Sequence, residues 1–213
     1  MTRDILPTGD RVYAAVKHLL LSGEVRPGER LDAARLADRH AASITPVRAA
    51  LHRLVGEGLV VAEAGEGFHA PRVTEASLRD LYVWNGRCLQ QALQMAISKG
   101  LAQNRDAIRT HRDRIAGFDL VVETERLFAS LGQRSGNDQC AEAIATLNDR
   151  LRVARALETQ LFANAAEELA SLSETMRTGS PGPSQTAISA YHRRRLRAAP
   201  ELVRLMHHPL AKD

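Results

Sequence analysis

The segment SITPVRAALHRLVGEGLV, from Ser43 to Val60, constrains the fold of this chain more than any other stretch. Its apolar residues recur at the spacing of one buried helix face, namely at Val47, Ala50, Leu51, Leu54 and Val55. Thr45 is a suitable N-cap, and Pro46 then takes the first helical position, where a missing backbone N–H is harmless. Gly56 or Gly58 would end the helix. The segment therefore predicts an amphipathic helix with a well-defined start.

The exposed face of this helix is unusual because it lacks acidic residues. Five residues form it, namely Thr45, Arg48, Ala49, His52 and Arg53. From Arg39 to Gly56 there are three Arg and two His but no Asp or Glu. An ordinary solvated face usually mixes both signs of charge. The composition favours a surface for phosphates and base edges, with a plain solvated face as the alternative.

The flanking segments predict a winged helix-turn-helix. A helical stripe runs from Asp10 to Ser22, a Pro-Gly turn follows, and Asp32 can cap a short helix with the sequence DAARLADRH. After the amphipathic helix, two short strands are expected at Leu59–Glu63 and Phe68–Val73, joined by a glycine-containing turn. Three helices followed by a hairpin within this length are typical of a winged DNA-binding domain.

Beyond Thr74 the strand signals end and long segments rich in Ala, Leu and Arg begin. The expected helices are Thr74–Ser98, Asn104–Gly117, Leu120–Arg134, Asp138–Ala163, Ala165–Thr178, Thr186–Ala198 and a short one from Glu201. The stretch TGSPGPSQT predicts a loop without helix, because it holds two Pro and two Gly. The fold class is mainly α: a winged helix-turn-helix domain over residues 1–74 and an all-helical antiparallel bundle over residues 75–213.

Composition excludes several classes of protein. Net charge is +4, yet residues 1–74 hold ten Arg and Lys against nine Asp and Glu, so bulk charge decides little. Cys88 and Cys140 are too few for a disulfide framework or a thiolate metal site. Neither a signal peptide nor a transmembrane run is visible, which predicts a soluble, cytoplasmic protein without a membrane partner. The sequence contains no paired nucleophile and base and no phosphate-binding glycine loop, so it does not indicate an enzyme. No catalytic residue and no cofactor are expected.

The first domain resembles the DNA-binding domain of GntR-family bacterial transcription regulators. The matching positions are Gly23, Pro27, Gly28, Leu36, Ala37, Ser43, Thr45, Pro46, Val47, Arg48, Ala50, Leu51, Glu57, Gly58, Leu59 and Gly67. The resemblance implies contacts to double-stranded DNA from this helix pair and from the wing at Gly65–His69. The candidate DNA-binding residues are Arg35, Ser43, Thr45, Pro46, Arg48, His52, Arg53, Gly67 and His69. Where the family usually has Arg this chain has Ile44, for which Arg39, His40 or Arg53 could compensate.

The segments ASLRDLYVWNGRCLQ and ERLFASLGQRSGNDQCAEAIATLNDRLRVAR resemble the first helix and the central helix pair of the helical ligand-binding and dimerisation domain of the FadR-type branch of this family. Many members of that branch bind a divalent metal through an Asp and three His. The matching positions here are Glu125, Ala129, Leu169 and His192, so two imidazoles are missing and no metal is expected. Asn85 stands where metal-binding members have an effector-contacting Arg, with Arg87 nearby. The candidate effector pocket therefore comprises Asn85, Arg87, Glu125 and His192.

Together these features predict a homodimeric repressor of a pseudo-palindromic operator, responsive to a small-molecule effector such as a carboxylate. The alternative is an effector-independent DNA-binding protein whose helical domain only dimerises. The run HRRRLR, from His192 to Arg197, is interpreted as a solvated helix face, or alternatively as a site for an anionic effector. Tyr82 and Trp84 are expected in the core.

Overall fold

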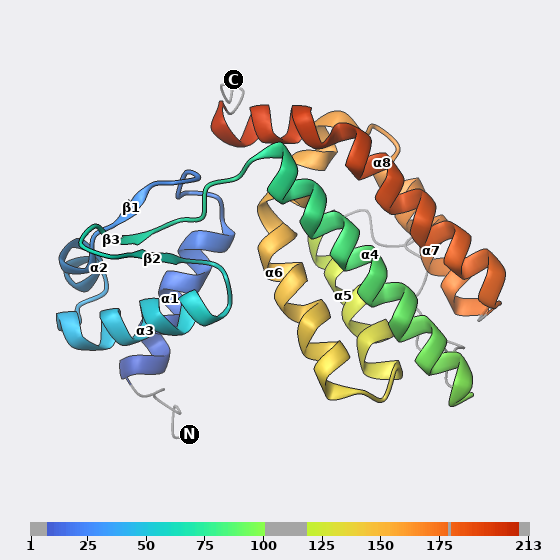
Figure 1. Ribbon diagram of the computed structural model, residues 1–213, viewed down its shortest axis with the longest axis horizontal. Coiled ribbons are helices and arrows are strands. Elements are labelled where there is room, and N and C mark those ends of the chain that lie inside the picture. Colours follow the sequence, from blue (N-terminus) through green and yellow to red (C-terminus); the bar gives the residue numbers. More distant parts are fainter. Residues whose placement is uncertain (1–7, 101–118, 179, 209–213) are drawn as a thin grey trace. The chain divides into compact units, whose positions relative to one another are not determined.

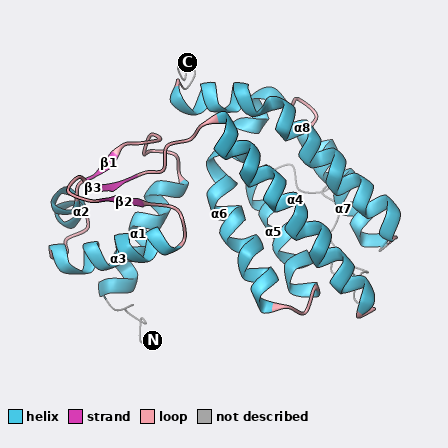
Figure 2. Ribbon diagram, in the orientation of Figure 1, coloured by secondary structure: helices cyan, strands magenta, loops and turns pink. Residues whose placement is uncertain are grey.

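The computed structural model describes residues 8–100, 119–178 and 180–208. The chain divides into two compact units, Met1–Val73 and Thr74–Asp213. Helices and a small sheet build the first unit, whereas the described part of the second unit is helical (Figures 1 and 2). The predicted fold class is confirmed.

In the first unit, helices α1 and α3 pack across a common apolar core. Its elements are α1 (Thr8–Leu21), β1 (Arg30–Leu31), α2 (Ala33–Arg39), α3 (Ile44–Gly56), β2 (Val61–Glu63) and β3 (Gly67–His69). Val12 and Val16 of α1 are fully buried, as are Leu51 and Leu54 of α3. Burial of such side chains is worth about 1.5–3 kcal/mol each, which holds α3 in place with its polar face outward.

Three sequence expectations for this unit need correction. Helix α3 begins at Ile44, and its N-cap is Ser43 rather than Thr45, so Pro46 is the third residue of the helix instead of the first. The position is tolerated because N–H groups of the first turn have no partner within a helix. The wing strands are shorter than expected, and an unpredicted strand, β1, pairs antiparallel with β3 to give the order β1-β3-β2. With only two residues, β1 is too short to show the alternating pattern that identifies a strand in a sequence.

The second unit packs its long helices around a core of aliphatic and aromatic residues. Its described elements are α4 (Glu75–Ser98), α5 (Leu120–Arg134), α6 (Asp138–Leu161), α7 (Ala165–Thr178) and α8 (Pro181–His207). Helix α4 contacts α5, α6 and α8, and the core between them includes Leu89, Phe128, Ile144 and Ile188 (Figure 1). Thr74 and Ser77 form a capping box that starts α4 at the predicted residue.

The C-terminal helix differs most from expectation. Helix α8 starts at Pro181 and continues through Pro200. The predicted loop after Thr178 is therefore shorter than expected, because residues 181–186 are helical, and the predicted break before Glu201 is wrong. Pro181 and Pro183 lie in the first turn, where a missing N–H is harmless. Pro200 removes one internal hydrogen bond, but Ala199 and Leu202 beside it are fully buried. Packing thus keeps the helix continuous across a proline.

Other expectations have mixed outcomes. Tyr82 is fully buried as predicted, whereas Trp84 is 57% exposed and not a core residue. The helix expected at Asn104–Gly117 lies outside the described residues. None of the described helices combines the length and apolarity that crossing a membrane requires.

Candidate nucleic-acid interface and effector pocket

Helix α3 separates its apolar and basic residues as the sequence predicts. Val47 and Leu51 are fully buried, whereas Arg48, His52 and Arg53 are exposed. Ile44, at the first position of the helix, is also 46% exposed. The outward face of α3 therefore carries cationic and apolar side chains and no carboxylate.

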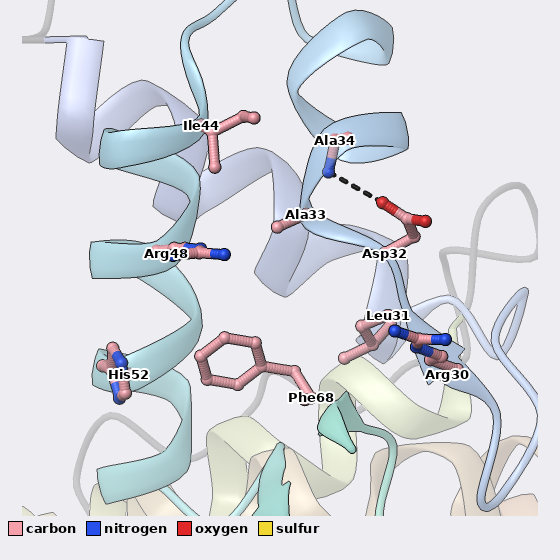
Figure 3. A pocket seen from close by; sticks show the side chains of 10 residues that line it. Arg30, Leu31, Asp32, Ala33, Ala34, Ile44, Arg48, His52 and Phe68 are labelled. Carbon is pink, nitrogen blue, oxygen red and sulfur yellow. Dashed lines mark hydrogen bonds between the residues drawn. The ribbon is translucent and has the colours of Figure 1, made fainter. Parts of the chain in front are cut away.

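A cleft of about 300 Å³ adjoins this face (Figure 3). Ile44, Arg48 and His52 line it from α3, and Gly67 and Phe68 line it from the wing. The remaining lining comes from the segment of β1 and α2 between Arg30 and Ala34. The ring of His52 meets that of Phe68 edge-on, with centroids 4.9 Å apart, so the wing packs directly against α3. The helix and the wing consequently form one continuous surface.

The two arginines of α3 have different surroundings. Arg53 is 3.4 Å from Asp10 and 3.8 Å from Glu57, and its guanidinium lies 3.7 Å from the centroid of the Tyr13 ring. Arg48 has no hydrogen bond or ion pair with any described residue, and it points into the cleft (Figure 3). Arg48 therefore has its full set of N–H donors available for a partner outside the protein.

A half-buried carboxylate ties α3 to α1. Glu57 accepts hydrogen bonds from Tyr13 at 2.6 Å and from Lys17 at 2.8 Å. Burial alone would raise the pKa of Glu57, but the bonds from Lys17 and Tyr13 outweigh it and lower the pKa. Glu57 is thus ionised and ties the end of α3 to α1.

The other predicted DNA contacts lie at the starts of the helices and on the wing. Arg35 is exposed in the first turn of α2, which is capped by Asp32. Ser43 and Thr45 are exposed at the start of α3, and Ser43 makes no side-chain capping bond. Gly67 belongs to the exposed part of the wing, whereas His69 is half-buried. Gly67 lines the cleft beside α3, whereas Arg35 lines a separate cleft beside β1 and α2.

In the second unit, two predicted pocket residues lie against each other inside the bundle. Asn85 of α4 and His192 of α8 are buried, with Asn85 Oδ1 3.0 Å from His192 Nε2. His192 Nδ1 lies 2.7 Å from the carbonyl oxygen of Ile188, and Gly86 leaves space for the imidazole, because a Cβ there would approach the ring to 3.1 Å. Burial lowers the pKa of His192 to about 4, so the ring is neutral at neutral pH.

Arg155 joins this pair from α6. It donates to Asn148 at 2.9 Å and to Asn85 at 3.4 Å, and its guanidinium lies 5.2 Å from the centroid of the Phe128 ring. The residue is only 2% exposed. A cationic side chain thus occupies the bundle interior beside His192.

The remaining predicted pocket residues do not join this interior cluster directly. Glu125 is half-buried and forms an ion pair with Arg152. Arg87 is exposed and lines a separate groove of about 260 Å³ between α4 and α8, together with Gly86, His192 and Arg193. The structure therefore divides the predicted pocket between an interior cluster and a surface groove.

A second buried network explains part of the HRRRLR run. Arg195 is 1% exposed and pairs with Glu158 at 2.9 Å and with Glu168 at 2.5 Å, and Tyr82 donates to Glu158 at 2.7 Å. Burial alone would lower the pKa of Arg195, but its contacts with Tyr191, Glu158 and Glu168 outweigh this and raise it. The interpretation of a fully solvated helix face is wrong at His192 and Arg195.

Comparison with known proteins agrees with this geometry. The family profile described as "Bacterial regulatory proteins, gntR family" matches residues 8–69. The Nta operon transcriptional regulator of Aminobacter aminovorans is 30% identical over 149 residues, which cover 67% of this chain and 70% of that protein. The chain belongs to the GntR family. It is a DNA-binding transcription regulator and not an enzyme.

Other relatives of this GntR-family protein match over shorter stretches or at the level of fold. The HTH-type transcriptional repressor GlaR of Escherichia coli K12 is 28% identical over 88 residues, covering 41% of this chain and 40% of that protein. The solved structure of E. coli McbR/YncC superposes with a TM-score of 0.68 at 19% identity, covering 92% of this chain and 99% of that one. A putative GntR regulator from Rhodococcus sp. RHA1 gives 0.67 at 14% identity, covering 91% and 97%. These structures share the fold of both units.

The interior of the bundle does not fit the divalent metal that the FadR-type resemblance implies. Two of the matching positions carry the side chains of Ala129 and Leu169, and Leu169 is buried among apolar residues. Glu125 is neutralised by Arg152, and both ring nitrogens of His192 face protein oxygens. A first-row metal normally needs three or more protein ligands, and the nearby Arg155 cation would repel it.

Sequence patterns did not reveal that Arg155 and Arg195 are buried. Arginine is normally exposed, and only the folded chain shows which carboxylates and amides surround it. Residue type alone does not distinguish these two from exposed arginines such as Arg193 and Arg197.

Proposed function

We propose that this GntR-family protein is a homodimeric repressor that binds a pseudo-palindromic operator through Arg48. The observation that carries the proposal is the exposed Arg48 guanidinium in the cleft between α3 and the wing, which forms no ion pair with a described residue. A guanidinium in this setting can pair bidentately with guanine in the major groove. Two copies related by a twofold axis would place two such helices on successive turns of the duplex.

The other exposed groups of this surface suit contacts to the DNA backbone. Arg35, Ser43 and Thr45 lie at helix starts, where backbone N–H groups also attract phosphate. His52 lies beside the wing, and the half-buried His69 belongs to it. Gly67 has no side chain, so it lets the backbone of the wing approach the DNA closely. Arg53 is held by α1, so we assign it a smaller, electrostatic contribution.

Genome-wide mapping of the DNA that the protein occupies tests the proposal. The expected result is a pseudo-palindromic motif with half-sites about one helical turn apart, upstream of genes whose transcription rises on deletion of the regulator. Occupancy without any shared motif would contradict sequence-specific binding, and a fall in transcription would contradict repression.

We propose that the dimer forms through the helical unit and includes the exposed side of α4. Val83 and Trp84 on this helix are 46% and 57% exposed. A large aromatic side chain in water is an unfavourable arrangement that a partner surface would relieve, and tryptophans often carry much of an interface's binding energy. A second copy of the chain is the occupant that a twofold-symmetric operator requires.

Replacement of Trp84 by Asp should therefore weaken the dimer. We expect a loss of about 2 kcal/mol or more, which raises the dimer dissociation constant by at least about 30-fold. Sedimentation equilibrium measures this constant directly. Ala170→Asp, on the exposed side of α7, is the control and should leave it unchanged. Equal dissociation constants for the wild type and Trp84→Asp would place the interface elsewhere.

We propose further that an anionic small molecule regulates the protein through the groove between α4 and α8. Arg87 and Arg193 provide two cationic groups at this groove, and His192 forms part of its wall. Carboxylates match guanidinium groups in charge and in planar geometry. Glu125 and Asn85 would act indirectly, by positioning Arg152 and His192.

A thermal-shift screen with small carboxylates tests this regulation. A ligand at 100 times its dissociation constant should raise stability by about 2.7 kcal/mol, or the melting temperature by roughly 5–10 °C. Arg87→Ala should abolish the shift, whereas Arg79→Ala on the same helix should retain it. If no carboxylate stabilises the wild type, the effector proposal fails.

The buried ionic network favours a second candidate function. Arg155 and Arg195 lie in the bundle interior and bind side chains of the protein itself, namely Asn148 and Glu158. This arrangement is compatible with a helical unit that only dimerises. This candidate is an effector-independent DNA-binding protein. It predicts operator affinity that stays constant across the same set of carboxylates in a gel-shift titration.

A further inference from the structure

Three potential metal ligands meet on the wing, outside the bundle. One ligand atom from each of Glu63, Glu66 and His69 lies within 4.8 Å of the other two. Glu63 Oε2 is 4.0 Å from His69 Nδ1. Among the described residues this is the group whose His, Cys, Asp or Glu side chains come together closely enough to hold an ion.

The geometry of the hairpin brings these residues together. The N–H of Glu66 donates to the carbonyl of Glu63 at 3.1 Å and closes a four-residue turn, with Gly65 at a φ of +80° in its third position. A positive φ at this position is typical of a type II turn and favours glycine. Val61 pairs with His69, and Glu63 pairs with Gly67, so Glu63 and His69 project from the same face of the sheet.

The polar groups of this cluster are not compensated by the rest of the described chain. Neither Glu63 nor Glu66 forms an ion pair with a described Lys or Arg, and two carboxylates at this separation repel each other. His69 Nδ1 is shielded from solvent and has no hydrogen-bond partner among the described residues, whereas a buried ring nitrogen normally has one. A bound cation would satisfy the imidazole nitrogen and both carboxylates together.

We propose that Glu63, Glu66 and His69 form a divalent transition-metal site on the wing, and that the bound ion strengthens DNA binding. The second part rests on the DNA-binding function proposed above. Two carboxylates on the wing would repel phosphates, whereas the same groups holding a dication present no net negative charge. The metal would thus convert the wing from a repulsive to a neutral contact.

The donor set defines the class of ion. One imidazole and two carboxylates suit Zn²⁺, Ni²⁺ or Co²⁺, whereas Mg²⁺ and Ca²⁺ prefer oxygen ligands alone. A zinc ion bound at about 2.0–2.2 Å would draw the ligand atoms closer together, which the exposed Glu66 side chain allows. Three protein ligands leave a coordination position for water.

Metal binding without DNA tests the site. Calorimetric titration of the full chain with Zn²⁺, and the visible absorption of a Co²⁺ titration, should each show one binding event per chain. Glu63→Gln, Glu66→Gln and His69→Ala should each weaken it by at least about tenfold, since even changes beside a metal's ligands cost about 10–100-fold. Glu167→Gln, on exposed α7, should leave it unchanged. Equal affinity in the wild type and the three wing variants would overturn the site.

DNA binding with and without Zn²⁺ tests the coupling. Zinc should raise the wild-type affinity for the operator by about three- to tenfold, as expected for removing two exposed charges near phosphates. The double variant Glu63→Gln/Glu66→Gln should bind DNA more tightly than the metal-free wild type and should not respond to zinc. An unchanged wild-type affinity would overturn the coupling while leaving the site intact. A protein that binds zinc at the wing but no DNA would instead overturn the proposed function.

Discussion

Replacement of Arg48 by Ala should abolish specific operator binding while the dimer stays intact. A bidentate arginine–guanine pair contributes about 1–3 kcal/mol of discrimination, and a dimer uses two of them. The expected loss is therefore about 2–6 kcal/mol, or roughly 30-fold to 10,000-fold in the dissociation constant. Because Arg48 forms no hydrogen bond or ion pair with a described residue, the substitution should leave stability nearly unchanged. Gel-shift titration measures the affinity, and sedimentation shows that the dimer persists.

Two further variants separate base recognition from charge. Arg48→Lys keeps the positive charge but lacks the planar fork, so it should lose most of the specificity and retain nonspecific binding. Arg26→Ala removes an exposed arginine of the same unit that lies outside the cleft, and it should keep specific affinity within a few-fold. An Arg48→Ala protein that binds the operator as tightly as the wild type would refute the assignment of α3 as the recognition helix.

Replacement of Glu158 by Ala should destabilise the helical unit strongly. Glu158 is 2% exposed, pairs with Arg195 and accepts a hydrogen bond from Tyr82. Without Glu158, the buried Arg195 cation would keep only its ion pair with Glu168 among the described residues. Breaking a buried ion pair by removing one partner typically costs about 3–5 kcal/mol. Urea denaturation followed by circular dichroism should show this loss in the free energy of unfolding.

An exposed pair of the same chemistry is the control. Glu201 and Arg204 are three residues apart on α8 and both are about half exposed. Glu201→Ala should lower the free energy of unfolding far less than Glu158→Ala does, because solvent screens surface pairs. Similar losses for Glu158→Ala and Glu201→Ala would mean that burial contributes little to the strength of the Glu158–Arg195 pair.

The helices follow the sequence patterns most closely where one face is apolar. Helix α5 begins and ends at the predicted residues, Leu120 and Arg134, and α4 starts at Glu75, one residue after the predicted Thr74. Local rules failed where long-range packing overrides them. Pro200 continues a helix because its neighbours Ala199 and Leu202 are buried, and no pattern within the segment reveals that burial.

The candidate sites also differ in whether local sequence patterns could predict them. Arg48 and His52 were predictable because helical spacing alone places them on the face opposite Val47 and Leu51. The wing cluster was not, since Glu63 and His69 meet only through the pairing register of β2 and β3. Likewise, the division of the effector pocket follows from the packing of Arg155 between α4 and α5.

By itself the sequence determined the winged-helix order, the acid-free face of α3 and the loss of two imidazoles at Ala129 and Leu169. These are properties of residue type and local spacing, which the chain carries in any conformation. The tertiary structure alone decided which charges are buried, which arginines remain free and which side chains share a site. Those outcomes depend on distances between residues far apart in the chain, which are set by the packing of whole helices and the register of the sheet.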